Sequence, residues 1–216
     1  MAFEAIVFDN DGLLLDTEHA WTRAEVELFA RRGAAFTEDH KRDLIGTSRT
    51  ESALKVERML DLPGRGEALM DELHELVLAE LAAGVPPRPG ALELVAAARA
   101  AGLPLGLASN SSREFLERAL AVSELANGHF DVVVSADDVS APKPAPDIYL
   151  AACAALGAAP AGSAALEDSP PGVAAARAAG MYVIAVPYFP DTVIEGASLM
   201  ARSLADPEVA AALGLG

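Results

Sequence analysis

The sequence predicts an α/β protein: a parallel sheet covered by helices, with an all-helical segment inserted after the first strand. Two observations lead to this fold class. Five short runs rich in β-branched and other apolar residues alternate with helical patterns, which is typical of a parallel sheet with helices on both faces. The segment from residue 17 to residue 84 shows only amphipathic helical patterns, and it separates the first run from the second.

The runs expected to form strands are short and apolar, and polar or turn-forming residues bound them. They cover residues 5–8, 105–109, 131–135, 164–167 and 182–186. Helical patterns lie between or beside them at residues 90–101, 112–122, 146–156 and 170–179. The last two patterns carry proline near the start and a glycine just past the end, at Gly157 and Gly180, which is the usual asymmetry of helix termini.

Four amphipathic patterns predict the helices of the inserted segment, at residues 19–31, 37–44, 49–60 and 66–83. The run of glycine and proline at residues 84–90 then predicts a stiff linker back to the sheet. We therefore expect an α/β core of residues 1–15 and 88–216 and a helical insertion of residues 16–87. The two connections, at residues 15–17 and 85–89, are expected to act as a hinge.

The composition restricts the partners and the compartment. The formal net charge of −16 makes nucleic acid and anionic membranes poor partners, and an anionic substrate would need a local positive site. The apolar runs are too short to cross a bilayer. A single cysteine, Cys153, allows no internal disulfide, and the first residues lack the features of a secretion signal. We therefore expect a cytoplasmic protein that binds neither membranes nor nucleic acid and is monomeric by default.

Polar side chains that can do chemistry follow the expected strands. They are Asp9 and Asp11 after the first strand, Ser109 and Asn110 after the second, Lys143 beyond the third, and Glu167 and Asp168 after the fourth. Because ligands of open α/β sheets bind at the carboxyl ends of the strands, we expect these side chains to converge. Each motif alone also fits an acidic turn, a helix start or a solvated lysine, so it is their joint occurrence that favours a site.

The carboxylates of Asp9 and Asp11 lie two residues apart, and they point the same way if the chain is still extended there. Close carboxylates repel unless a cation lies between them or one keeps its proton. Asp168 could complete a site made only of oxygen atoms, which suits Mg²⁺ when water and a substrate phosphate supply further ligands. The sequence therefore points to a magnesium site, with Gly12 allowing the backbone to turn sharply after Asp11.

Four segments, in order over nearly the whole chain, resemble the four motifs of the haloacid dehalogenase superfamily. They are Phe-Asp-Asn-Asp-Gly-Leu-Leu-Leu-Asp-Thr-Glu at 8–18, Ala-Ser-Asn-Ser at 108–111, Lys-Pro-Ala-Pro-Asp-Ile-Tyr at 143–149 and Leu-Glu-Asp-Ser-Pro-Pro-Gly at 166–172. The insertion after the first strand resembles the helical cap of the phosphoglucomutase-like branch. The resemblance implies a Rossmann-like core with such a cap. One departure is Asn10, where the family often has an apolar residue, and a polar contact to a neighbouring strand or the cap is expected there.

The resemblance also implies a Mg²⁺-dependent phosphatase. Asp9 would attack phosphorus and form an acyl-phosphate, and Asp11 would protonate the leaving alcohol and then take a proton from water. Mg²⁺ would be held by the Asp9 carboxylate, the backbone carbonyl of Asp11 and the Asp168 carboxylate, while Glu167 would contact a water of the metal.

The same resemblance assigns the residues that would hold the substrate. Ser109, the amide of Asn110 and Lys143 would bind the phosphoryl oxygens. The segment Ile-Gly-Thr-Ser-Arg at 45–49 looks like the substrate loop of the cap, so that Gly46, Thr47 and Arg49 are candidate substrate contacts. The expected substrate is a small phosphorylated metabolite, a sugar phosphate or sugar-alcohol phosphate by resemblance.

Two alternatives remain open from the sequence. A β-phosphoglucomutase shares the cap and the catalytic residues, but that family usually carries a histidine where Trp21 stands here, and His19 comes two residues too early. The run from Glu18 to Trp21 looks more like hexitol- and deoxyglucose-phosphate phosphatases. A non-catalytic binding module on the same fold is the alternative from another class, although such a module has no need for both Asp9 and Asp11.

Overall fold

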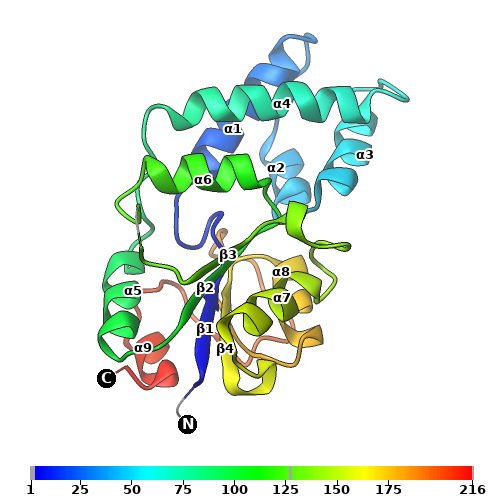
Figure 1. The fold of residues 1–216 in the computed structure, drawn as a ribbon. Coiled ribbons are helices and arrows are strands. Elements are labelled where there is room, and N and C mark those ends of the chain that lie inside the picture. Colours follow the sequence, from blue (N-terminus) through cyan, green and yellow to red (C-terminus); the bar gives the residue numbers. More distant parts are fainter. Residues whose placement is uncertain (1–2, 127, 216) are drawn as a thin grey trace.

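Six parallel strands form the central sheet of the computed structural model, which describes residues 3–126 and 128–215 (Figure 1). The strands are β1 Ala5–Phe8, β2 Leu105–Ala108, β3 Val132–Val134, β4 Ser163–Glu167, β5 Tyr182–Ala185 and β6 Leu199–Met200. Their order in the sheet is β3-β2-β1-β4-β5-β6, and every neighbouring pair is parallel. The carboxyl end of β1 therefore lies between those of β2 and β4, which places Asp9 beside the residues that follow both neighbours.

Helices cover both faces of the sheet, as the sequence predicts (Figure 1). The helices of this part are α5 Ala91–Ala100, α6 Arg113–Ala121, α7 Asp147–Leu156, α8 Pro170–Ala178 and α9 Pro207–Leu213, with short 3₁₀ turns at Ala136–Asp138 and Pro160–Gly162. Ile148 and Val173 bring α7 and α8 into one buried cluster, and Val95, Leu116 and Val209 bring α5, α6 and α9 into the other. Two residues of β6 and seven of α9 are too few for a readable period, so the sequence did not predict these elements.

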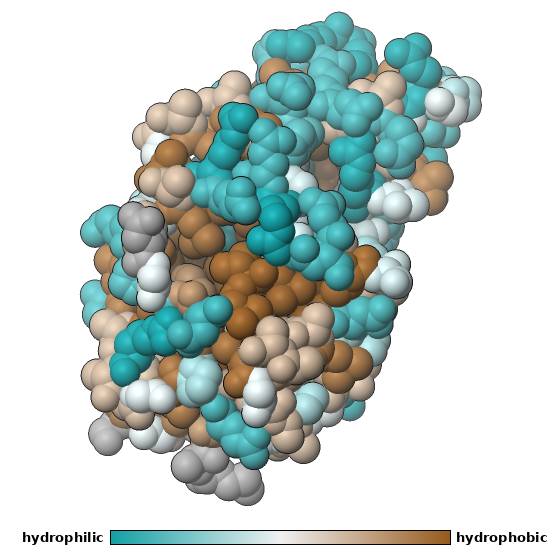
Figure 2. Space-filling view, viewed as in Figure 1, coloured by the Kyte–Doolittle hydropathy of each residue, from teal (hydrophilic) through white to brown (hydrophobic). Residues whose placement is uncertain are grey.

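The helical insertion, which we define as α1 to α4, lies over the carboxyl-terminal edge of the sheet (Figure 1). Its helices are α1 Glu18–Ala30, α2 Glu38–Leu44, α3 Arg49–Met59 and α4 Gly66–Leu81, within a few residues of the predicted bounds. Buried side chains such as Leu28 and Val77 join α1 to α4. Figure 2 shows hydrophilic residues over much of the insertion on one face of the molecule, with a hydrophobic area on the part below it.

The two connections between insertion and core run side by side. The backbone N–H of Asp16 donates to the carbonyl of Pro86 at 2.9 Å, and the N–H of Arg88 donates to the carbonyl of Leu14 at 2.8 Å. The expected hinge segments therefore form one paired strip, and the hinge motion itself stays a prediction. Within the described residues, no helix has the length and apolar content needed to cross a membrane.

A buried ion cluster joins two helices of the insertion. Nζ of Lys41 on α2 lies 2.5 Å from Oε2 of Glu18 and 3.0 Å from Oε2 of Glu25, both on α1. The three side chains are at most 8% exposed. Burial alone would lower the pKa of Lys41, but the two glutamates hold it above the ordinary value for lysine. The charged form of Lys41 is therefore favoured, and removal of Lys41 would leave two buried carboxyl groups without this partner.

Replacing this lysine should destabilise the protein strongly. Lys41→Ala is expected to lower the free energy of unfolding by about 3–5 kcal/mol, the usual cost of breaking a buried ion pair on one side. Chemical denaturation followed by circular dichroism measures this change. Arg31→Ala is the control, because Arg31 also pairs with two glutamates of the insertion but its side chain is 47% exposed. Equal losses in both variants would contradict the role given to Lys41.

Candidate active site

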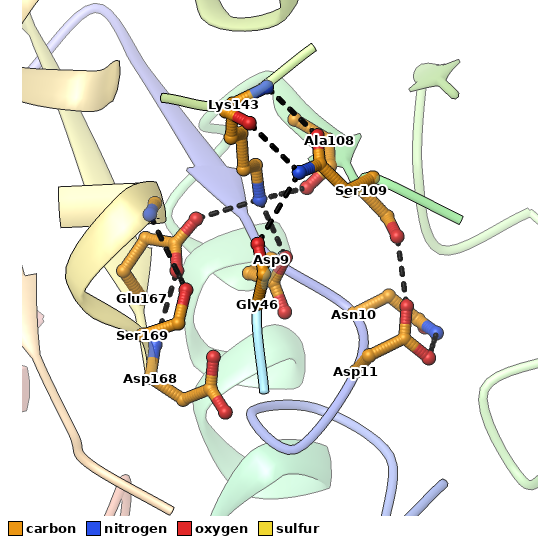
Figure 3. Close-up of polar contacts among 12 residues, drawn as sticks. Asp9, Asn10, Asp11, Gly46, Ala108, Ser109, Lys143, Glu167, Asp168 and Ser169 are labelled. Atoms are coloured by element: carbon orange, nitrogen blue, oxygen red, sulfur yellow. Dashed lines mark hydrogen bonds and ion pairs between the residues drawn. The ribbon is translucent and has the colours of Figure 1, made fainter. Parts of the chain in front are cut away.

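The carboxylates of Asp9 and Asp11 both follow β1 but meet different partners (Figure 3). Oδ1 of Asp9 accepts from Nζ of Lys143 at 2.5 Å. Asp11 instead accepts from three hydroxyl groups, those of Ser109 at 2.7 Å, Ser111 at 2.8 Å and Thr17 at 2.8 Å. The strand ends at Phe8, before either aspartate. Both aspartates line the same cavity, and the expectation that they point the same way stays a prediction, while their different partners give them different chemical environments.

Two carboxylate oxygens at this site are buried without a hydrogen-bond donor among the described residues. They are Oδ2 of Asp9 and Oδ2 of Asp168. Burial, with the negative charge of Glu167 adding to it, raises the pKa of both aspartates well above the usual range, although Lys143 opposes this. An orphaned, buried anionic oxygen is costly unless a cation satisfies it, so these two atoms fit a metal site.

The candidate metal ligands form a compact group of three carboxyl groups, from Asp9, Glu167 and Asp168, whose ligand atoms lie within 4.8 Å of one another. The carboxylate of Asp11 is not in this group, and its expected contribution through the backbone carbonyl stays a prediction. Gly12 stands close to the group with φ of +79°, and a Cβ there would collide with Oδ2 of Asp168. Both its conformation and its lack of a side chain are therefore needed at this turn.

Lys143 lies at the centre of a buried polar network. Besides Asp9, its Nζ donates to Oε1 of Glu167 at 2.6 Å and to the carbonyl of Ala108 at 2.9 Å. Burial alone would lower the pKa of Lys143, but Asp9 and Glu167 hold it above the ordinary value, so the side chain stays cationic. Oη of Tyr149, on α7, donates to the same glutamate oxygen at 2.5 Å. Tyr149 lies within the third of the four motifs, and the sequence alone assigns it no role.

Glu167 has little bonding capacity left for a metal-bound water. Its second oxygen, Oε2, accepts from the hydroxyl of Ser169 at 3.1 Å and from the N–H of Asp168 at 3.2 Å. Together with Lys143 and Tyr149 it therefore has four donors. In this structure Glu167 mainly orients Lys143 through their hydrogen bond. Its expected contact with a metal-bound water stays a prediction.

The side chain of Asn110 holds the segment that carries Lys143. Its Oδ1 accepts from the backbone N–H of Lys143 at 2.8 Å, and its Nδ2 donates to the carbonyls of Lys143 at 3.1 Å and Gly46 at 3.3 Å. The predicted phosphate contact through the Asn110 amide stays a prediction. Asn10 is also fully buried, and it donates to Oδ1 of Asp11 at 3.2 Å rather than to a strand or the insertion as expected.

A cavity lies between the insertion and the strand ends, and the candidate site residues line it. The lining includes Asp9, Asp11, Gly46, Thr47, Arg49, Ser109, Asn110, Lys143 and Asp168. Of the predicted chemical residues, only Glu167 is behind the wall, where it is fully buried. The structure therefore brings together nearly all of the residues that the sequence singled out, from the segments that follow β1, β2, β3 and β4 and from the insertion.

The predicted substrate loop of the insertion does not present a free arginine. Nη2 of Arg49 donates to Oδ1 of Asp71 at 2.7 Å, and Nε donates to Oε2 of Glu67 at 3.3 Å. Thr47 uses its hydroxyl on the carbonyl of Leu44 and on Ser52, both at 2.6 Å. Arg49 borders the cavity, but its charge is already paired with Glu67 and Asp71. Its contact with substrate stays a prediction.

Several lining residues were not assigned to the site from the sequence. The rings of Trp21 on α1 and Phe115 on α6 lie 5.0 Å apart across the boundary between insertion and core. Lys41 and His74 also line the cavity, and Nε2 of His74 lies 3.5 Å from Oε2 of Glu114. Each of these residues sits in an amphipathic helix. The helical period indicated that one face of each helix is buried, but it did not indicate which other part of the chain lies against that face.

The chain is similar to proteins of one known family. A model of the haloacid dehalogenase-like hydrolases matches residues 3–180, most of the chain. The chain belongs to the haloacid dehalogenase-like hydrolases. It is 36% identical to protein CbbY of Rhodobacter capsulatus over 87% of this chain and 86% of that one. It is also 36% identical to hexitol phosphatase B of Escherichia coli K12, over 85% and 83%.

Among solved structures, the fold is similar to a mutant of CbbY from Rhodobacter sphaeroides in complex with xylulose 1,5-bisphosphate. The TM-score is 0.81 with 32% identity, over 94% of this chain and 96% of that one. The predicted superfamily, its helical insertion and the likeness to hexitol phosphatases are therefore confirmed. The protein is a hydrolase of the phosphatase type, so the alternative of a non-catalytic module is set aside.

The contact between Gly46 and the core gives a test of how closely the insertion must approach. Gly46 has φ of +73°, and a Cβ there would lie 2.5 Å from Cβ of Ser169. Gly46→Ala should therefore push the insertion off the strand ends and lower kcat/KM for an aryl phosphate by at least ~10-fold, because small misplacements of site residues are costly.

A matched control separates this clash from backbone strain. Gly64 also lies in the insertion and has φ of +77°, but a Cβ there meets nothing within 4 Å. Gly64→Ala carries the same left-handed strain and should leave kcat/KM nearly unchanged. Similar kinetics for the two variants, measured on folded protein, would contradict the importance of the Gly46–Ser169 approach.

Proposed function

We propose that the protein is a Mg²⁺-dependent phosphomonoesterase that forms a phospho-aspartate on Asp9. One observation carries the proposal: the orphaned oxygens of Asp9 and Asp168 lie beside the cation of Lys143 in one cavity. A phosphoryl dianion needs such positive charge in a protein of net charge −16. Asp9, Asp168 and the backbone carbonyl of Asp11 would hold Mg²⁺, which supplies charge neutralisation at the phosphoryl oxygens when bound.

The residues of the chain divide the reaction into two steps. A carboxylate oxygen of Asp9 attacks phosphorus, and the bond from phosphorus to the ester oxygen breaks while Asp11 gives that oxygen a proton. Water then attacks the same phosphorus and gives a proton back to Asp11, which releases inorganic phosphate and restores Asp9. The buried Lys143, with Ser109 and the amide of Asn110, orients the phosphoryl group during both steps.

The three hydroxyl donors on Asp11 suggest how this residue is controlled. Ser109 gives its hydroxyl hydrogen to Asp11 in this structure, and it is also a proposed phosphate contact. A bound phosphoryl group competes for that hydrogen. As the Ser109 hydroxyl turns to the phosphoryl oxygen, Asp11 loses one hydrogen-bond donor. Asp11 can then contact the leaving oxygen and give it a proton. Thr17 and Ser111 hold its orientation meanwhile.

The insertion is proposed to act as a cap that closes over the substrate and excludes bulk water. The proposed boundaries are residues 1–15 and 88–216 for the core and residues 16–87 for the cap. Contacts across the boundary, such as Trp21 with Phe115, support this role. The proposed site of action is the cytoplasm, with the chain as a monomer.

The named relatives support a phosphorylated sugar or sugar alcohol as the substrate. A β-phosphoglucomutase is the weaker candidate. Trp21 stands where that family usually carries a histidine, and it packs on Phe115 at the cavity wall, so it supplies no acid–base group at that place.

The nucleophile is tested with p-nitrophenyl phosphate. We expect the wild type to turn over with Mg²⁺ and to lose that activity in EDTA, and we expect Asp9→Asn to be inactive with the metal present, because an amide oxygen is a poor nucleophile. Asp39→Asn, an exposed aspartate of α2 in the insertion, is the control for the loss of one charge. Full activity of Asp9→Asn, or of the wild type in EDTA, would contradict the proposal.

The acid role of Asp11 is tested by changing the leaving group. Asp11→Asn should lower kcat/KM for a sugar-alcohol phosphate by about 10²–10⁴-fold, the scale of general acid catalysis. The loss should be smaller for p-nitrophenyl phosphate, because p-nitrophenolate leaves without a proton. The value of kcat/KM reports the steps up to the first irreversible one, so it isolates the transfer to Asp9. Equal losses on both substrates would argue against proton donation by Asp11.

A further inference from the structure

The end of the cavity lined by the insertion and α6 combines an apolar wall with basic residues that already have acidic partners. The wall is formed by side chains from α1, α3, α4 and α6, namely Trp21, Val56, Met70, Leu73 and Phe115. Three basic residues of the insertion border the same space: Lys41, Arg49 and His74. Whether a negatively charged leaving group can bind here depends on whether these basic side chains can pair with a further anion.

Each of the three has acidic partners. Lys41 lies between Glu18 and Glu25, so that the buried cluster has one cation and two carboxyl groups. Arg49 is shared by Glu67 and Asp71. His74 lies 3.5 Å from Glu114. The fourth basic residue of the lining, Lys143, is used at the phosphoryl end by Asp9 and Glu167.

We propose, on the basis of the phosphatase function above, that this end of the cavity selects monophosphate esters with an uncharged, partly apolar leaving group and discriminates against bisphosphates. A second phosphate placed among these residues would meet no unpaired cation within the described lining, and it would lie near the carboxylates that neutralise Lys41 and Arg49. Its water shell would be lost without replacement. An uncharged leaving group meets no such cost, and its apolar face can pack on Trp21 and Phe115.

The pairing of Arg49 is the part of this arrangement that can be changed without harm to the fold. Glu67 and Asp71 have side chains that are 68% and 77% exposed, so their replacement leaves no buried group unpaired. Glu67→Gln with Asp71→Asn would leave the charge of Arg49 free at the edge of the cavity. The released arginine would then be available to a second phosphate.

The experiment compares 4-hydroxyphenyl phosphate with 1,4-phenylene bisphosphate, which differ only by the second phosphate. The release of inorganic phosphate gives kcat/KM for each, with the bisphosphate value halved for its two equivalent esters. In the wild type we expect the bisphosphate to be at least ~10-fold poorer. In the Glu67→Gln/Asp71→Asn variant this ratio should shrink at least ~3-fold, with the monophosphate nearly unchanged.

The double variant Glu27→Gln/Glu72→Gln is the matched control. It removes the same number of charges from two glutamates of the insertion that pair with Arg31 and, for Glu72, also with Arg32. Neither arginine lines the cavity. The control should keep the wild-type ratio. If both double variants shrink the ratio equally, the total charge and not the pairing of Arg49 sets the preference, and the proposal is overturned.

The remaining outcomes separate this inference from the proposed function. Turnover of p-nitrophenyl phosphate together with equal use of the two hydroquinone esters overturns the selectivity but leaves the phosphatase intact. Turnover of p-nitrophenyl phosphate together with a higher kcat/KM for 1,4-phenylene bisphosphate than for 4-hydroxyphenyl phosphate overturns the preference for an uncharged leaving group. Absence of all turnover with Mg²⁺ means that the proposed function fails, and the selectivity that rests on it fails as well.

Discussion

The site depends on the buried pairing of Lys143 with Asp9 and Glu167. One lysine nitrogen contacts the residue after β1, the last residue of β4 and the carbonyl that ends β2, at distances of 2.5, 2.6 and 2.9 Å. A cation with so little exposure is stable only because these partners surround it. The same pairing keeps Asp9 beside a positive charge, aimed into the cavity, before any substrate arrives. Tyr149 and Asn110 restrain the lysine from opposite ends, through Glu167 and through the backbone.

Around this centre, two neighbouring aspartates have opposite environments. Among the residues that the structure describes, Asp9 keeps an oxygen with no hydrogen-bond donor, whereas Asp11 has three hydroxyl donors and the Asn10 amide. Under the proposed function this difference separates their roles: Asp9 would bond with the metal and with phosphorus, and Asp11 would exchange a proton. Gly12 makes the arrangement fit, since any side chain there would displace the carboxylate of Asp168.

The strongly acidic composition has a local counterpart at the cavity. The basic residues of the insertion that border it have acidic neighbours in space, so the proposed function relies on Lys143 and a bound Mg²⁺ at the strand ends for the positive charge that holds a phosphoryl group. Under the proposed selectivity, this arrangement accepts one phosphoryl group and disfavours a second one. The helical insertion therefore contributes shape and an apolar surface more than charge, through the contact of Trp21 with Phe115 and the close approach of Gly46 to Ser169.

The sequence by itself determined the parallel sheet, the helical insertion and the strand-end residues Asp9, Ser109, Lys143 and Asp168, because period, turn residues and motif order are local properties of the chain. The tertiary structure alone decided that Arg49 meets Asp71, that Lys41 joins Glu18 and Glu25, and that Glu167 holds Lys143 with the help of Tyr149. These partners belong to different helices and strands. Helical and strand periods show which face of an element is buried, but the side chain that meets it across the interface depends on how the elements pack.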